Sequence, residues 1–125
     1  MRLIVHTPLH AVIQLRPHAT VPAWTAGKGF VSITRTATEL SIICPESRVP
    51  PEFPAARGWT LIELEGPLDF GAVGILHALL TPLAQSGVPV LTMATHDTDF
   101  VLVRDAKCAC SALAEAGYQV TWPSG

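Results

Sequence analysis

The sequence predicts an α+β fold in which two helices cover one face of an antiparallel sheet. Between Trp59 and Trp122 the pattern reads strand, helix, strand, strand, helix, strand, which is the order of a split βαβ arrangement. Two loops with polar and glycine residues, Gly66–Gly71 and Thr95–Asp99, interrupt the apolar segments. The chain has 125 residues, 49% of them hydrophobic and only 14% charged, so it can bury a sizeable core. These features predict one compact domain, or two very small modules that share a core, whose loops carry the function.

The first half of the chain is made of strands. Residues 9–15 alternate between apolar and polar side chains, the period of a half-buried strand. Prolines and glycines in residues 17–29 exclude a long helix there. Phe30–Thr36 and Glu39–Cys44 read as two further strands. The short connection Ala37-Thr38 predicts that these two strands form a hairpin.

A proline-rich linker follows the third strand and sets the predicted internal boundary. Four prolines lie between Pro45 and Pro54, and Gly58 closes the stretch. Such a density of proline prevents a regular strand or helix. We therefore predict a β-rich unit over residues 1–57 and a second unit over residues 58–125. The first unit lacks a convincing helix, so we expect it to depend on the second for burial.

The second half begins with a strand at Ile62 and Leu64 and continues into a helix. Asp69 is the expected N-cap of this helix, because aspartate accepts bonds from the first free N–H groups. An apolar stripe at three- and four-residue spacing marks its buried face: Ile75, Leu76, Leu79, Leu80 and Leu83. Gly87 is expected to end the helix in a left-handed conformation.

Two apolar runs and a second helix complete the pattern. Val88–Ala94 and Phe100–Val103 are nearly continuous apolar runs, which is typical of central strands. Asp105 is the expected N-cap of the second helix and Gly117 its end. Residues 118–122 alternate in a last strand.

Composition narrows the class of function. The formal net charge is -2 and the eight lysines and arginines are scattered, so no basic surface for nucleic acid is expected. No apolar run approaches the roughly 18 residues of a membrane span, and the N-terminus lacks a secretory signal. Three cysteines, Cys44, Cys108 and Cys110, do not make a disulfide framework or a metal site. We therefore expect a cytoplasmic protein without metal or cofactor.

The two polar loops offer complementary chemistry. Glycines at a helix start let a ligand approach free backbone N–H groups, which suit a carboxylate. Asp97 and Asp99 in the second loop suit an ammonium or guanidinium group. Together the two loops fit an amino acid. Two other readings stay open: the glycines only permit close packing and the aspartates only form a turn, or His96 and the aspartates perform acid–base chemistry.

Several stretches resemble the ACT domain family, and within it the short bacterial paired-ACT proteins related to the cytosolic arginine sensors. The residues that carry the resemblance are Phe30–Thr36, Thr38–Cys44, Gly66–Leu68, Gly74–Leu76, Pro82–Ala84 and Ala94–Val103. The resemblance implies a ferredoxin-like βαββαβ unit preceded by a degenerate ACT-like unit. It also implies a small-molecule site between the two units.

The resemblance and the loop chemistry lead to one functional expectation. We expect a non-catalytic regulatory module that binds an amino acid, forms a homo-oligomer and acts on a separate protein target. The alternative is a structural module that forms an oligomer without a ligand. The expected ligand-binding residues are Ser41, Ile42, Asp69, Phe70, Gly71, Val73, Gly74, Thr95, His96, Asp97, Thr98 and Asp99.

Overall fold

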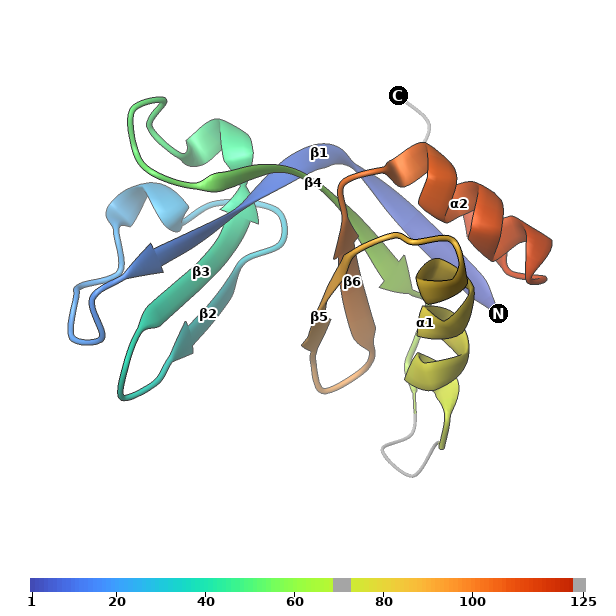
Figure 1. Cartoon of the computed structure of the whole chain (residues 1–125). Coiled ribbons are helices and arrows are strands. Elements are labelled where there is room, and N and C mark those ends of the chain that lie inside the picture. Colours follow the sequence, from blue (N-terminus) through green and yellow to red (C-terminus); the bar gives the residue numbers. More distant parts are fainter. Residues whose placement is uncertain (69–72, 123–125) are drawn as a thin grey trace. The chain divides into compact units, whose positions relative to one another are not determined.

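The computed structural model describes residues 1–68 and 73–122 of the chain (Figure 1). The chain divides into two compact units. Unit 1 comprises Met1–Thr7 and Thr60–Gly125, and unit 2 comprises Pro8–Trp59. The sequence placed all of residues 1–57 in the first unit, whereas in the structure the first seven residues belong with the second half of the chain.

Unit 2 is a small sheet built on the predicted hairpin. Strand β2 (Ser32–Arg35) pairs antiparallel with β3 (Leu40–Pro45), and β3 pairs antiparallel with the second half of β1 (Arg2–Leu15). The predicted hairpin is therefore confirmed. Its turn is closed by Thr36, whose side-chain oxygen accepts hydrogen bonds from the N–H groups of Thr38 and Glu39.

The core of unit 2 lies on one face of this sheet. It comprises Ala11, Ile13, Leu40, Ile42, Cys44 and Val49. Cys44 is fully buried, as expected for a core thiol. Two arginines donate hydrogen bonds to backbone carbonyls of the proline-rich loops: Arg48 to Thr25, and Arg57 to Pro50 and Phe53. These loops contain prolines, which have no backbone N–H and prevent regular strand pairing. The arginine side chains therefore supply hydrogen bonds to carbonyl groups of the loop backbone.

Unit 1 has the predicted βαββαβ order. After β4 (Ala56–Leu64) its elements are α1 (Ile75–Gln85), β5 (Val90–Ala94), β6 (Asp99–Val103), α2 (Ala106–Glu115) and β7 (Gln119–Thr121). Both helices lie on the same face of β4, β5 and β6 (Figure 1). Their apolar stripes pack on alternate strand residues, including Ile62, Leu64, Val101 and Val103. The ferredoxin-like fold predicted from the sequence is confirmed in this unit.

The first half of β1 is inserted into the sheet of unit 1, which the sequence did not predict. Arg2–Ile4 pairs in parallel with β7. On its other side β1 neighbours β4, where the N–H of Glu65 donates to the carbonyl of Arg2 at 3.0 Å. An ion pair joins Arg2 to Glu65 at 3.1 Å, and a hydrogen bond joins Nε2 of His6 to Oε1 of Glu63 at 2.8 Å. The order of strands in unit 1 is therefore β7-β1-β4-β6-β5.

The prediction that both apolar runs form central strands is wrong for β5. Strand β6 lies between β4 and β5, whereas β5 is the last strand of the sheet. Leu91 on β5 is 38% exposed. An apolar run reads the same on an edge strand as on a central one, so hydrophobicity alone could not order the strands.

The helix starts show one correct and one wrong capping prediction. The side chain of Asp105 accepts a 3.0 Å hydrogen bond from the N–H of Cys108 and caps α2, as predicted. Helix α1 begins only at Ile75, after Gly74, so Asp69 is not its N-cap. Among the described residues, neither helix has the length and hydrophobicity needed to cross a bilayer.

Candidate functional site

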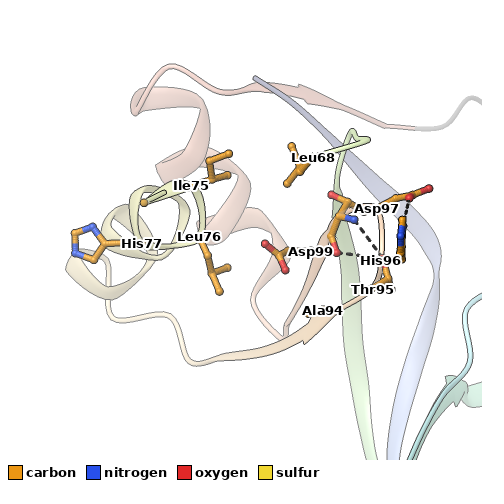
Figure 2. A pocket seen from close by; sticks show the side chains of 11 residues that line it. Leu68, Ile75, Leu76, His77, Ala94, Thr95, His96, Asp97 and Asp99 are labelled. Atoms are coloured by element: carbon orange, nitrogen blue, oxygen red, sulfur yellow. Dashed lines mark hydrogen bonds and ion pairs between the residues drawn. The ribbon is translucent and has the colours of Figure 1, made fainter. Parts of the chain in front are cut away.

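A pocket of about 380 Å³ lies within unit 1, between the first turn of α1 and the turn that joins β5 to β6 (Figure 2). One wall is apolar and comes from the start of α1 and from Leu68. The other wall is the β5–β6 turn, which carries most of the polar atoms. The lining residues are Leu68, Gly74, Ile75, Leu76, His77, Ala94, Thr95, His96, Asp97, Thr98 and Asp99.

Two threonines close the β5–β6 turn. The N–H and the hydroxyl of Thr95 both donate to the carbonyl of Thr98, at 2.8 and 3.1 Å. The N–H of Thr98 donates in return to the hydroxyl of Thr95 at 3.3 Å. The hydroxyl of Thr98 is buried and donates to the carbonyl of Leu64 at 2.6 Å. Both threonine side chains therefore shape the turn.

The two aspartates of the turn lie differently. Asp97 bonds to His96, with Oδ1 and Nδ1 2.8 Å apart, and their side chains are 71% and 84% exposed. Both lie on the side of the turn that faces away from α1, whereas the carboxyl group of Asp99 points toward Leu76 (Figure 2). Asp99 is half-buried. The structure thus distinguishes Asp99, which faces the pocket interior, from Asp97 at its rim.

The start of α1 supplies the opposite electrostatic character. Gly74 precedes the helix with φ of 77°, and it offers no side chain to cap the first turn. The first N–H groups of a helix have no intrahelical partner, and the helix dipole is positive at this end. Because Gly74 and Ile75 line the pocket, these groups can hold an anion there.

The predicted site residues fall into four groups, of which the last, Ser41 and Ile42, lies in unit 2. Those that line the pocket are Gly74, Thr95, His96, Asp97, Thr98 and Asp99. Val73 does not line it, and is 93% exposed. Asp69, Phe70 and Gly71 lie outside the described residues.

Ser41 and Ile42 belong to unit 2 and are described with it. Both lie on β3, where Ile42 is opposite Ile13 on one side and Ile33 on the other. The side chain of Ile42 is fully buried in the core of unit 2, whereas Ser41 is half-buried. Of the two, only Ser41 has a side chain that water reaches.

Several lining residues were absent from the sequence prediction. Leu68, Ile75, Leu76 and Ala94 form the apolar part of the pocket, and His77 lies at its edge with the ring pointing away (Figure 2). The sequence assigned Ile75 and Leu76 to the core stripe of the helix. Their position could have indicated this role: Ile75 and Leu76 are the first two residues of the helix after Gly74, next to the loop that was expected to bind the ligand.

Acid–base catalysis finds little support at this site. It would need the His96 ring within reach of both aspartates inside the pocket, whereas the ring is 84% exposed and contacts Asp97 on the side of the turn that faces away from α1 and from Asp99. Within residues 1–68 and 73–122, no three His, Cys, Asp or Glu side chains come together in a way that could hold a metal ion. The arrangement is suited to binding a small zwitterion.

Two family profiles match the chain. A profile described as an ACT domain matches residues 55–115, and one described as an N-terminal domain matches residues 9–52. The chain is 31% identical over 87 residues to a Bos taurus protein named cytosolic arginine sensor for mTORC1 subunit 1. That match covers 61% of this chain and 26% of the bovine protein, so the chain spans about a quarter of that relative.

Solved structures share the fold. A crystal structure of an Agobacterium tumefaciens protein superposes with a TM-score of 0.92 and 33% identity, covering 99% of this chain and 94% of the other. A structure of aspartokinase α and β subunits superposes with a TM-score of 0.63 and 13% identity, covering 93% and 97%. The second likeness concerns the fold alone.

Proposed function

Because the chain belongs to the ACT domain family, we propose that it is a non-catalytic regulatory module that binds an amino acid in the pocket of unit 1. The observation that carries the proposal is the pairing of an uncapped helix start with an inward-facing carboxylate across one pocket. The N–H groups after Gly74 hold the ligand carboxylate. Asp99 holds its ammonium group through a charge-assisted bond.

Asp99 is preferred over Asp97 because of what each carboxyl group faces. Asp97 is bonded to His96 and lies largely in water, where an ion pair with a ligand contributes little. Asp99 is half-buried and faces the apolar residue Leu76. An ion pair between this half-buried carboxylate and a ligand ammonium group is screened less by water and salt than one at the surface. The apolar wall of Leu68, Ile75 and Leu76 then accommodates the ligand side chain.

The remaining predicted contacts extend the site in the proposal. Ser41, the Ile42 backbone, Asp69, Phe70 and Gly71 remain predicted ligand contacts in the proposal. Replacing Ser41 by Ala tests this extension without disturbing the buried Ile42.

The regulatory part of the proposal rests on the relatives. The bovine relative is named as a cytosolic arginine sensor. By analogy this chain senses an amino acid in the cytoplasm and passes the signal to a separate protein target. The geometry of the pocket supports only the class of ligand, an amino acid; the sensing role and the protein target rest on the analogy.

Calorimetry with each of the twenty amino acids tests the proposal. We expect one or a few to bind, and Asp99→Asn to weaken binding at least tenfold, because a charge-assisted bond contributes about 1.5–3 kcal/mol. The matched control is Asp97→Asn, which we expect to change affinity less than threefold. The proposal would be contradicted if none of the twenty amino acids bound at millimolar concentration, or if both variants lost the same amount of affinity.

The alternative function is an oligomerisation module without a ligand. Its supporting observation is edge strand β5, which exposes Leu91 and could pair with a second copy of the chain. Light scattering of the wild type and of Leu91→Lys distinguishes the two. A dimer that Leu91→Lys dissociates, and that neither amino acids nor Asp97→Ala affects, would favour the alternative.

A further inference from the structure

Gly66 lies directly against the β5–β6 turn. A Cβ atom at this position would lie 2.8 Å from the carbonyl oxygen of Asp97 and 3.1 Å from Cβ of Thr98. The described glycines with a positive φ are Gly27, Gly29, Gly58, Gly74, Gly87 and Gly117, and Gly66 is not among them. The need for glycine at residue 66 therefore comes from the close approach of the turn and not from an unusual backbone angle.

Two hydrogen bonds hold the turn on both sides of this contact. The N–H of Leu68 donates to the carbonyl of Asp97, and the hydroxyl of Thr98 donates to the carbonyl of Leu64 at 2.6 Å. Segment 64–68 thus binds two consecutive residues of the turn. Leu68 at one end of this arrangement and Asp99 at the other both line the pocket.

We propose that Gly66 is a positioning residue of the pocket, whose missing side chain sets the distance between Leu68 and Asp99. The inference rests on the proposed function, because it concerns how the two walls of that binding site are held. A methyl group at residue 66 must displace either the Asp97 carbonyl or segment 64–68. Either displacement breaks the Leu68–Asp97 bond and moves Asp99, which follows two residues after Asp97.

The test compares Gly66→Ala with Gly87→Ala. A Cβ at Gly87 meets nothing within 4 Å, but its φ of 71° makes alanine unfavourable. Gly87→Ala therefore destabilises the same unit at the far end of α1 without touching the pocket. It separates a loss of stability from a change in the site.

The first measurement is amide hydrogen exchange at Leu68, which needs no ligand. In Gly66→Ala we expect exchange of Leu68 to accelerate by about two- to tenfold beyond the acceleration of the slowest core amides, since the loss of one hydrogen bond corresponds to about that range. In Gly87→Ala we expect Leu68 to follow the core amides. An unchanged Leu68 amide in Gly66→Ala would overturn the proposal.

The second measurement is binding of L-arginine, L-leucine and L-aspartate as cationic, apolar and acidic probes. For any probe that binds the wild type, we expect a loss of fivefold or more in Gly66→Ala and no loss in Gly87→Ala. Equal affinities in wild type and Gly66→Ala would overturn the positioning role. If no probe binds the wild type, the amino-acid function is contradicted for these classes, while the exchange measurement still decides the role of Gly66.

A second variant covers the case in which Gly66→Ala does not fold. Thr98→Val removes the bond to Leu64 without adding bulk, and so loosens the same junction from its other side. We expect exchange of Leu68 to accelerate beyond that of the slowest core amides here too, whereas in Thr98→Ser, which retains the hydroxyl, Leu68 should follow the core amides. If the Leu68 amide of Thr98→Val exchanged no faster than in the wild type, relative to the core amides, the proposed coupling between the walls that carry Leu68 and Asp99 would be contradicted.

Discussion

The hydroxyl of Thr98 donates a buried 2.6 Å hydrogen bond to the backbone carbonyl of Leu64, across the junction of β4 and the β5–β6 turn. Leu64 is fully buried and Thr98 is 8% exposed. A buried carbonyl that loses its partner costs about 1–3 kcal/mol. This one side chain therefore contributes to the stability of unit 1 as well as to the shape of the pocket.

Thr98→Val should lower the free energy of unfolding by about 1–3 kcal/mol, because valine keeps the volume but leaves the Leu64 carbonyl unpaired. Urea denaturation followed by circular dichroism measures the change. Thr98→Ser is the control, since it keeps the donor and loses only a methyl group, worth about 1 kcal/mol or less. If serine were as harmful as valine, packing rather than the hydrogen bond would explain the loss.

Asp105→Ala should lower the free energy of unfolding by about 1 kcal/mol, because α2 loses the side chain that accepts from the Cys108 N–H. Thermal and urea unfolding both report the change. Asp105→Asn retains an acceptor and should recover most of the loss. Full stability in the alanine variant would mean that water caps the helix equally well.

Leu79→Ala should destabilise unit 1 by about 2–5 kcal/mol, because Leu79 is fully buried between α1 and the sheet. Leu91→Ala is the matched control on edge strand β5, where the side chain is 38% exposed. It should cost about 1 kcal/mol or less in a monomer. A large loss at Leu91 would instead indicate that a partner covers this strand.

The three cysteines should react at different rates. Burial raises the pKa of the Cys110 thiol, and burial raises that of Cys44 although the nearby Arg48 charge opposes it. A raised pKa lowers the thiolate fraction at a given pH, so both thiols need a higher pH to react. Cys108 is only half-buried. At pH 8, iodoacetamide and mass spectrometry should show one fast site, which Cys108→Ser removes.

The same pKa shifts predict weaker folding at alkaline pH. The unfolded thiols lose their protons near the ordinary pKa of 9.0, whereas the folded ones keep theirs to higher pH. Stability from this source is therefore complete below about pH 9 and declines above it. Urea midpoints measured from pH 8 to pH 10 should fall, and should fall less in a Cys110→Ala variant relative to its own value at pH 8.

The local features of the fold could be read from the sequence, because they depend on neighbouring residues. The cap at Asp105 and the hairpin around Thr36 follow from spacing and side-chain chemistry alone. The prediction that Asp69 is the N-cap was wrong because the sequence does not show that α1 begins only after Gly74. A polar residue before an apolar stripe marks a region in which a helix starts, but not the residue.

The wrong or missing predictions concern contacts between distant residues. Nothing near Arg2 indicates that it pairs with Gln119, and nothing in Val90–Ala94 distinguishes an edge strand from a central one. The same holds for the pocket. Its polar turn was predicted, while Leu68 and Leu76 were missed because apolar residues look alike whether they face a core or a cavity.

The insertion of β1 between β7 and β4 has a consequence for how the chain is made. Strands near opposite ends of the sequence must meet before the sheet of unit 1 is complete, and pairing of such distant segments is slow. Unit 2 has all its strands earlier and can fold during synthesis. A ribosome-bound nascent chain that stops before Gln119 should therefore carry a folded unit 2 beside an open sheet, which is a surface for chaperones to bind.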